Sequence, residues 1–208
     1  MRYRIKICGL TDPGQALMVA SAGADAIGLV FYPRSRRAVT VEAAVAIVEV
    51  LPPFVATVGL FVDPSREEVE RVLSGCRLDF LQFHGAEDAD FCNGFGIPYL
   101  KALAMADGAD PRPMMDAHPY ARGFLLDSHG TGKMGGSGTA FDWRAIPGPL
   151  QRPWLLAGGL DAVNVGQALA LTDPFGVDVS SGVESAPGRK DPRLVRDFVD
   201  AVRQVERD

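Results

Sequence analysis

Two groups able to move a proton stand directly after short apolar runs of the sequence. Cys8 follows Ile5 to Ile7 and precedes a glycine, and Asp127 closes the run Phe124 to Leu126. The carboxyl ends of parallel strands carry the chemistry in many α/β folds, because they meet at one face of the sheet or barrel. A thiol and a carboxyl group at two such ends are suited to general base and general acid catalysis in one pocket.

Both residues also have a structural alternative. A cysteine in a strand is most often a small buried apolar side chain. Because Cys8 is the last strand residue before a Gly turn, however, a catalytic role is favoured as much as a structural one. A thiol with a pKa of about 8.5 needs only a modest shift to act as a base near neutral pH. The alternative for Asp127 is a helix cap or a loop anchor. Charged side chains are rarely buried without a role, and burial would keep this carboxyl protonated and able to donate.

Two Gly-rich turns occur late in the chain, each after an apolar run. The first contains Gly158 and Gly159, and the second contains Ser180, Ser181 and Gly182. In barrels, the turns after the seventh and eighth strands commonly bind phosphate through backbone N–H groups. We therefore expect a phosphate site here, the alternative being two ordinary turns.

Further polar residues follow other apolar runs. A loop after the second run carries Arg34, Arg36 and Arg37, any one of which could bind a substrate carboxylate through two hydrogen bonds. The alternative is a solvated basic loop, and spacing alone does not choose among the three. His84 and Asp178 are expected to face the barrel mouth. A lone histidine is more often structural, and the residues alone do not assign a role to Asp178; we place both among the substrate-binding residues.

Short apolar runs alternate with amphipathic helical segments along the whole chain. The expected strands are Ile5–Cys8, Ala26–Phe31, Ala56–Phe61, Phe80–His84, Tyr99–Ala102, Phe124–Asp127, Trp154–Ala157 and Gly176–Ser180. They lack polar alternation, which is typical of parallel strands buried on both faces. The clearest expected helices are Gln15–Ala22, Val41–Leu51 after Thr40, the segment after the Ser65–Glu68 capping box, and Pro192–Val205.

About eight strand–helix repeats in roughly 200–250 residues predict a (β/α)₈ (TIM) barrel, forming a single domain over residues 1–208. The alternative is an open doubly wound sheet. That fold favours a Gly-x-Gly-x-x-Gly turn after its first strand, which the segment Cys8 to Pro13 does not contain. The Gly-rich segment Ser128 to Thr139 follows the sixth strand and is predicted to be a mobile lid rather than a plain surface loop.

Composition excludes several kinds of partner. The chain has 208 residues, with 47% hydrophobic and 23% charged residues, a net charge of −5 and a pI near 5.2. Nucleic acids and anionic membrane surfaces are bound by basic faces, so we expect neither as a partner. No run approaches the ~20 apolar residues of a membrane span, and no signal peptide precedes the first strand.

The cysteines and histidines point to a reducing compartment and away from metals. Cys8, Cys76 and Cys92 are widely spaced and form no zinc-type pair, which favours free thiols in the cytoplasm. His118 and His129 have no partners at metal-ligand spacing. We therefore predict no metal site.

The ordered set of motifs resembles the phosphoribosylanthranilate isomerase family of tryptophan biosynthesis over nearly the whole chain. Each motif is short, but the set is specific. The matching segments are Lys6 to Thr11, Phe31 to Pro33 with Ser35 and Arg37, Leu81 to Gly85, Leu125 to Asp127, Gly135 to Gly138, Phe141 to Trp143, Gly158 to Leu160, and Val177 to Glu184 with Pro187, Gly188, Lys190 and Asp191.

The resemblance implies a cofactor-independent Amadori rearrangement of N-(5'-phosphoribosyl)anthranilate, a phosphosugar–anthranilate compound, by a monomer or homodimer. It assigns Asp127 as the acid that opens the sugar ring and Cys8 as the base at C2'. It also selects Arg37, among the three arginines, for the anthranilate group. The resemblance also assigns the binding of the substrate phosphate to the two Gly-rich turns.

One position departs from the family pattern. Thr139 stands where the loop usually has a lysine, which removes a loop cation but neither proposed catalytic residue. One alternative is the histidine-pathway isomerase that performs the same rearrangement; proteins resembling it have an aspartate at the end of the first strand, whereas this chain has Cys8. The other is a non-catalytic barrel that binds phosphometabolites, and the presence of both Cys8 and Asp127 disfavours it.

Overall fold

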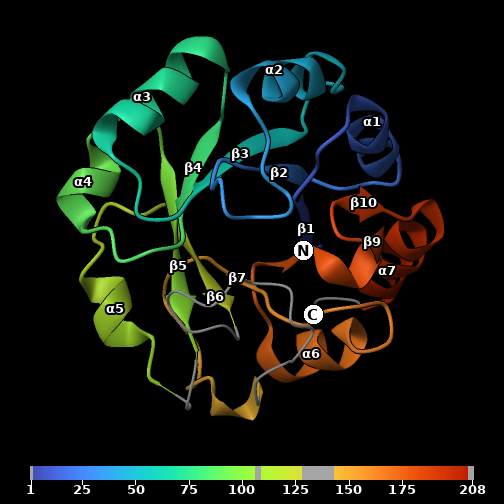
Figure 1. Cartoon of the computed structure of the whole chain (residues 1–208). Coiled ribbons are helices and arrows are strands. Elements are labelled where there is room, and N and C mark those ends of the chain that lie inside the picture. Colours follow the sequence, from blue (N-terminus) through green and yellow to red (C-terminus); the bar gives the residue numbers. More distant parts are fainter. Residues whose placement is uncertain (1, 106–108, 128–142, 206–208) are drawn as a thin grey trace.

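Eight parallel strands close into a barrel in the computed structural model, which describes residues 2–105, 109–127 and 143–205. The chain order β1 to β8 is also the order around the barrel, and β1 pairs with β8 to close it. Figure 1 shows the helices arranged around the strands. The strands are β1 (Arg4–Cys8), β2 (Ala26–Val30), β3 (Ala56–Phe61), β4 (Phe80–Phe83), β5 (Tyr99–Ala104), β6 (Gly123–Asp127), β7 (Trp154–Leu156) and β8 (Gly176–Val179).

The (β/α)₈ prediction is therefore confirmed, and every expected strand is present with ends within two residues of those predicted. The largest difference is at β5, which continues to Ala104 because it pairs with β6 as far as Asp127. The described helices are α1 (Pro13–Ser21), α2 (Val41–Glu49), α3 (Arg66–Gly75), α4 (Ala89–Asn93), α5 (Arg112–Asp116), α6 (Val165–Thr172) and α7 (Pro192–Gln204).

Side-chain capping starts several helices where the sequence predicts. Thr40 accepts a hydrogen bond from the backbone of Ala43 at the start of α2, and Ser65 and Glu68 form the expected capping box of α3. Helix α1 begins earlier than predicted. Asp12 caps it and Pro13 occupies its first position, where a missing N–H costs nothing.

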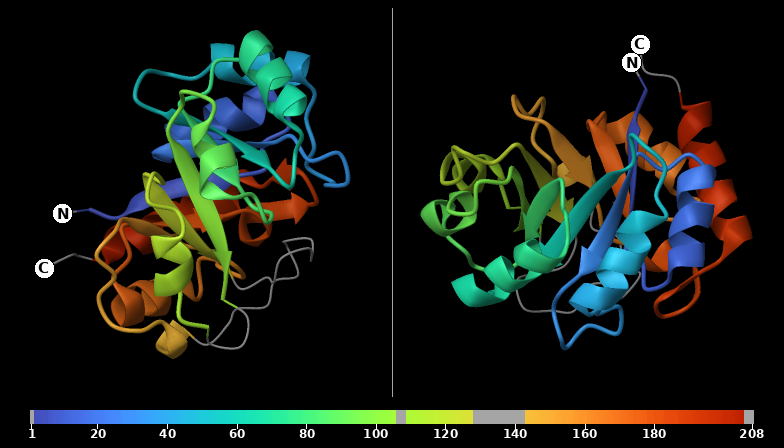
Figure 2. Two further views of the ribbon diagram at one scale, coloured as in Figure 1. Left: turned by 90° about the vertical axis from the view of Figure 1, so that its left-hand side faces the viewer. Right: turned by 90° about the horizontal axis from the view of Figure 1, so that it is seen from above.

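The buried face of α7 is formed by four apolar side chains. Leu194 is 37% exposed, whereas Val195, Phe198, Val199 and Val202 are buried. These four have i, i+3, i+4, i+7 spacing, which makes a continuous stripe on one side of a helix. Arg203 near the end of α7 donates to the carbonyl of Tyr3 at 2.9 Å, which joins this helix to the residue before β1. Figure 2 shows α7 alongside β1.

Residues alternate along each strand between the barrel interior and the surrounding helices. Ile5 and Ile7 belong to the large cluster that packs under the helices, whereas Cys8 contacts Val30 and Leu60 in a separate interior cluster. Lys6 and Cys8 share the interior face of β1, because side chains two apart point the same way. The same alternation places Asp127 two residues beyond Leu125, which belongs to another interior cluster.

Two short elements follow β8 and bear directly on the site. A turn of 3₁₀ helix, η3 (Ser181–Val183), leads into a two-stranded hairpin made of β9 (Glu184–Ala186) and β10 (Arg189–Lys190). Another 3₁₀ turn, η2 (Trp143–Ala145), precedes β7. Within the described part of the chain, no helix is long and apolar enough to cross a membrane.

Candidate active site

Cys8 ends β1 with its side chain inside the barrel and only 6% of the residue exposed. Its register partner on β2 is Gly28, and a Cβ atom at Gly28 would lie 2.6 Å from Sγ of Cys8. The missing side chain at Gly28 therefore makes room for the sulfur. Gly9 then turns the chain with φ +81°, a conformation that favours glycine.

A buried ion pair lies next to Cys8. Nζ of Lys6 donates to Oδ1 of Asp178 at 2.9 Å, and the two side chains are 2% and 9% exposed. Burial opposes the charge on Lys6, but Asp178 and Cys8 outweigh it and raise the lysine pKa. Lys6 is therefore a fixed cation beneath the sulfur.

Burial is the largest influence on the Cys8 thiol and raises its pKa above the ordinary value. The ammonium groups of Lys6 and Lys190 oppose this shift, and the carboxylate of Asp178 adds to it. The thiol is thus the resting form near neutral pH, and the thiolate, when formed, is a strong base with a cation beside it.

Asp127 and His84 form the other half of the site. Nε2 of His84 lies 3.2 Å from Oδ2 of Asp127, and the amide nitrogen of Gln82 lies 3.3 Å from Nδ1 of His84. When Gln82 donates to Nδ1, the imidazole proton is on Nε2 and His84 donates to Asp127; this tautomer is assigned from the hydrogen-bond network. Gln82 is fully buried, and its Oε1 has no partner among the described residues.

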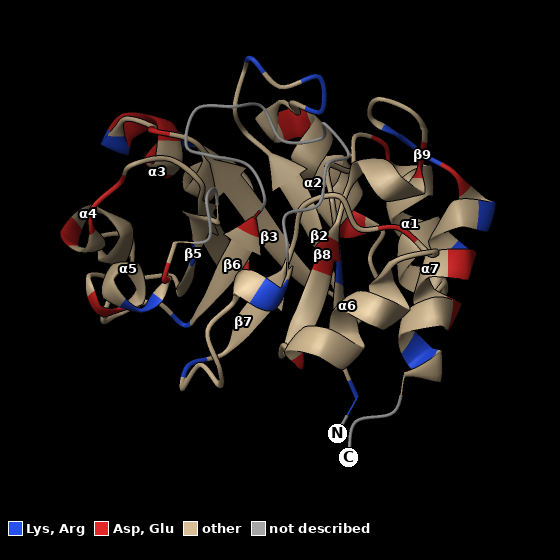
Figure 3. Cartoon of the chain, turned by 90° about the horizontal axis from the view of Figure 1, so that it is seen from below, with Lys and Arg blue, Asp and Glu red and all other residues tan. Residues whose placement is uncertain are grey.

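Asp178 connects the two halves electrostatically. Burial raises its pKa; Lys6 and His84 favour its charged form, and Asp127 disfavours it. The carboxylate of Asp178 also raises the pKa of Cys8. The structure thus brings Cys8, Asp178, Asp127 and His84 into one interacting set. Figure 3 shows the acidic positions on β6 and β8 within the ring of strands.

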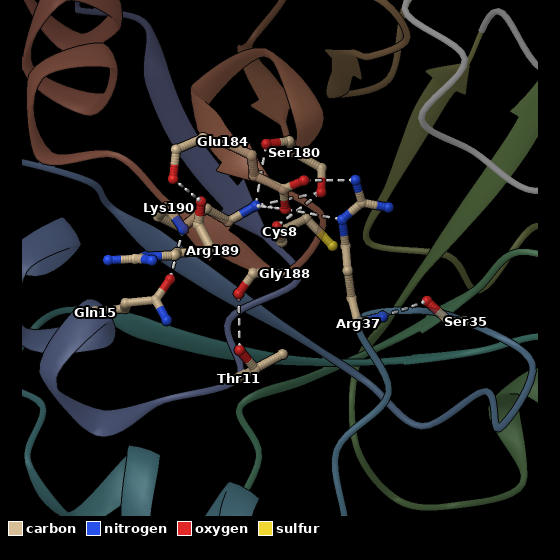
Figure 4. A network of polar contacts seen from close by, with 11 residues as sticks. Cys8, Thr11, Gln15, Ser35, Arg37, Ser180, Glu184, Gly188, Arg189 and Lys190 are labelled. Atoms are coloured by element: carbon tan, nitrogen blue, oxygen red, sulfur yellow. Dashed lines mark hydrogen bonds and ion pairs between the residues drawn. The ribbon is translucent and has the colours of Figure 1, made fainter.

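Of the three loop arginines, Arg34 and Arg36 are exposed and Arg37 is partly buried. The Arg37 side chain passes over Gly9. A Cβ atom added at Gly9 would lie 2.4 Å from Cδ of Arg37, so glycine makes room for the arginine. Its guanidinium forms two hydrogen bonds with Glu184, of 2.8 and 2.7 Å. Arg37 is therefore the arginine that reaches the site, and Glu184 holds it there (Figure 4).

The two Gly-rich turns lie against one another. Gly158 and Gly159 have φ of +84° and +66°. A Cβ at Gly182 would come within 1.9 Å of the carbonyl oxygen of Leu160, so only glycine fits this close approach. The hydroxyl of Ser180 donates to the carbonyl of Cys8 at 2.9 Å, and Ser181 begins η3. This arrangement ties the second turn to the end of β1.

Several functional-site residues were missed by sequence reasoning, namely Lys6, Gln82, Glu184 and Lys190. Lys6 and Gln82 each interrupt an apolar run two residues before a predicted site residue, at Cys8 and His84. That period-2 spacing is a signal that could have identified them as interior. The pairing of Glu184 and Lys190 comes from the β9–β10 hairpin, which was not predicted.

The predicted lid, Ser128 to Thr139, lies outside the described residues, and so do His129 and Thr139. His118 is buried and contacts the hydroxyl of Tyr99 at 3.4 Å. Among the residues that are described, no group of three or more His, Cys, Asp or Glu side chains is arranged to hold a metal ion.

The fold is a closed (β/α)₈ barrel with a thiol and a carboxyl group at the ends of β1 and β6, and comparisons with known proteins give the family. The family model of N-(5'-phosphoribosyl)anthranilate (PRA) isomerase matches residues 5–201. The N-(5'-phosphoribosyl)anthranilate isomerase of Pseudomonas paraeruginosa is 54% identical over 205 residues, covering 99% of this chain and 97% of the relative. The chain therefore belongs to the phosphoribosylanthranilate isomerase family.

Solved structures agree with this assignment. A phosphoribosylanthranilate isomerase in complex with reduced 1-(o-carboxyphenylamino)-1-deoxyribulose 5-phosphate has a TM-score of 0.79 and 37% identity, covering 98% of this chain and all of the other. Monomers of the dimeric isomerase from Thermotoga maritima have a TM-score of 0.81 and 34% identity, with the same coverage.

Proposed function

We propose that this chain converts N-(5'-phosphoribosyl)anthranilate into 1-(2-carboxyphenylamino)-1-deoxyribulose 5-phosphate, a step of tryptophan biosynthesis. Family membership and the 54% identity to a curated isomerase support the reaction. The observation that carries the chemistry is the pair of strand ends in one barrel: Cys8 ends β1 beside the Lys6–Asp178 ion pair, and Asp127 ends β6 with His84 at 3.2 Å.

In the proposed first step, Asp127 transfers a proton to the ring oxygen of the ribose. The bond between C1' and that oxygen breaks, and the nitrogen lone pair forms an iminium ion at C1'. His84 then stabilises the new carboxylate by donating from Nε2, which lies 3.2 Å from Oδ2. Such charge-assisted hydrogen bonds are stronger than neutral ones.

In the second step, the thiolate of Cys8 removes the C2' proton, and the electron pair of that bond neutralises the iminium to give an enolamine. The enolamine tautomerises: C1' gains a proton and the C2' hydroxyl loses one, leaving a ketone. The step is internally balanced, because C1' is reduced while C2' is oxidised. The nearby ammonium of Lys6 favours the thiolate that the step needs.

The two anionic ends of the substrate hold the reacting carbons in place. We assign the anthranilate carboxylate to Arg37, and the phosphate to the backbone of Gly158, Gly159 and the Ser180–Gly182 turn. Phosphate is remote from the bonds that change, so its binding energy can be used for positioning. His84 and Asp178 complete the substrate cavity as neighbours of the acid and the base.

We propose a cytoplasmic location, supported by three cysteines that are free and buried. A relative from Thermotoga maritima is described as dimeric, with monomers also solved. We propose a monomer or homodimer, which sedimentation of the purified chain would distinguish.

The direct test is turnover by the purified chain, followed by the loss of anthranilate fluorescence from the substrate. The histidine-pathway aminoaldose is assayed beside it. We expect conversion of the anthranilate compound and strong preference for it. Preference for the histidine-pathway compound would reassign the substrate, and binding without turnover would make the chain a non-catalytic phosphometabolite-binding barrel.

A further inference from the structure

The β9–β10 hairpin places two buried charges behind Arg37. Glu184 and Lys190 are register partners in the hairpin, and their side chains are only 4% and 0% exposed. Nζ of Lys190 donates to Oε1 of Glu184 at 2.7 Å. Buried charges are costly unless paired, and here the pair extends to a third residue, the partly buried Arg37.

Glu184 occupies one edge of the Arg37 guanidinium. Nε donates to Oε1 at 2.8 Å and Nη2 donates to Oε2 at 2.7 Å. A guanidinium has five N–H groups, so the end edge, formed by Nη1 and the second hydrogen of Nη2, still offers two parallel donors. Nη1 has no hydrogen-bond partner within the described residues. Glu184 thereby fixes which edge of Arg37 is presented.

Lys190 preserves the positive charge of the group. One carboxylate between two cations leaves Arg37, Glu184 and Lys190 with one net positive charge. Burial opposes ionisation of Glu184, but Arg37 and Lys190 outweigh it and hold the pKa of this carboxyl below its usual value. Without Lys190, the carboxylate of Glu184 would cancel the charge that Arg37 offers to an anion.

Lys190 also connects this group to the base. Its Nζ donates to the carbonyl of Ser180 at 3.0 Å, and the Ser180 hydroxyl donates to the carbonyl of Cys8. The hairpin is held against the β1–α1 turn by Thr11, whose hydroxyl donates to the carbonyl of Gly188 at 2.8 Å. Figure 4 shows Cys8 between Lys190 and Arg37, with its sulfur directed toward the Arg37 side chain.

We propose that Glu184 and Lys190 are positioning residues that select substrates bearing an aryl carboxylate. Glu184 locks Arg37 so that its end edge faces the anthranilate carboxylate, and Lys190 keeps the trio cationic. The inference rests on the proposed function, because it assumes that Arg37 meets this carboxylate. It identifies Glu184 and Lys190 as the residues that determine how strongly the enzyme prefers a substrate with an aryl carboxylate.

The test compares two ligands by calorimetry. One is reduced 1-(o-carboxyphenylamino)-1-deoxyribulose 5-phosphate, and the other is the same compound without the carboxyl group. We expect the wild-type chain to bind the first ligand at least about tenfold more tightly, because a tenfold ratio corresponds to about 1.4 kcal/mol and hydrogen bonds to a charged group contribute at least that much. Glu184→Gln adds one net positive charge, but its amide accepts through only one atom and no longer holds both N–H groups of Arg37. Because we assign the preference to the orientation of Arg37, this ratio should fall by about tenfold despite the added charge, while the affinity for the second ligand stays within about twofold.

Glu70→Gln is the matched control. Glu70 is an exposed residue of α3 whose side chain pairs with Arg66 at 3.7 Å, and the change should leave the ratio as in wild type. Equal losses for both ligands in Glu184→Gln would show a merely structural role and overturn the inference. An unchanged ratio would overturn it as well.

Lys190→Met is the second variant, for the case in which Glu184→Gln does not fold. It removes the compensating cation, so the ratio should again fall, and an unchanged ratio would contradict the inference. In an Arg37→Met background, Glu184→Gln should produce no further change in the ratio. Wild-type protein that neither turns over substrate nor binds either ligand would overturn the proposed function itself. A wild type that works, with a ratio insensitive to Glu184, would overturn only this inference.

Discussion

The ammonium of Lys6 and the carboxylate of Asp178 lie 2.9 Å apart inside the barrel, on register partners of β1 and β8, the two strands that close it. The pair is almost completely buried and lies next to Cys8. The same contact therefore contributes to barrel closure and sets the charge beneath the proposed base.

Removing Lys6 should destabilise the protein and weaken the base. Lys6→Met leaves the Asp178 carboxylate buried without its partner, and breaking such a pair costs about 3–5 kcal/mol. Urea denaturation of Lys6→Met measures this loss in the free energy of unfolding. The double variant Lys6→Met with Asp178→Asn should recover most of the stability. It should still turn over slowly, because the cation beside the thiolate is gone. A double variant as unstable as the single one would contradict this.

Alkylation of Cys8 should follow an alkaline pH profile. The thiolate is the form that reacts, and burial raises the pKa of this thiol in the folded state. Below that pKa the thiolate fraction rises with pH, so the iodoacetamide rate should still be increasing where a free thiol, with a midpoint at about pH 8.5, has levelled off. Mass spectrometry of the Cys8 peptide measures the rate in folded and urea-unfolded chains. A midpoint pH that is lower in the folded chain than in the unfolded chain would contradict the predicted rise in the pKa of Cys8 on folding.

Gly28→Ala should impair catalysis by displacing Cys8. The added methyl group would lie 2.6 Å from Sγ of Cys8, so the thiol must move. We expect kcat to fall at least about tenfold with a destabilisation of about 1–3 kcal/mol, typical of overpacking. Gly166→Ala in α6 is the control, because its methyl group would have an ordinary contact of 3.8 Å with Val205. Steady-state kinetics in which both variants resemble wild type would refute the assigned contact.

His84→Ala should reduce kcat by about tenfold, a smaller loss than that of Asp127→Asn. The imidazole lies 3.2 Å from the Asp127 carboxylate and is partly exposed, so the loss should be near the lower end of the about 1.5–3 kcal/mol that a hydrogen bond to a charged group contributes, which is about tenfold in rate. Steady-state kinetics on the anthranilate substrate checks this. A change confined to KM would instead place His84 among groups that only bind substrate.

The sequence predicted the barrel well because its signals are local. Apolar runs, the Ser65–Glu68 capping box and the Gly turns each depend on a few neighbouring residues, and all are in the structure. The helix Pro192–Val205 was predicted from its periodicity, but Leu194 and Val195 are both apolar, and only packing decides which one is buried.

The site was predicted less completely because its contacts join distant segments. Glu184 meets Arg37 across 147 positions of sequence, and Lys6 meets Asp178 across 172. No spacing rule connects such residues. The position of Cys8 and Asp127 at strand ends was visible, whereas the ion pairs that control them depend on strand register and on the β9–β10 hairpin.

The most direct measurement for this account is kcat of purified Cys8→Ala and Asp127→Asn with N-(5'-phosphoribosyl)anthranilate. A positioned base or acid contributes ~10²–10⁴-fold, so each variant should lose at least about 100-fold in kcat. Each should still bind reduced 1-(o-carboxyphenylamino)-1-deoxyribulose 5-phosphate within about threefold of wild type, since the anion-binding groups remain. Near-normal turnover in either variant would contradict the assignment of Cys8 as base and Asp127 as acid.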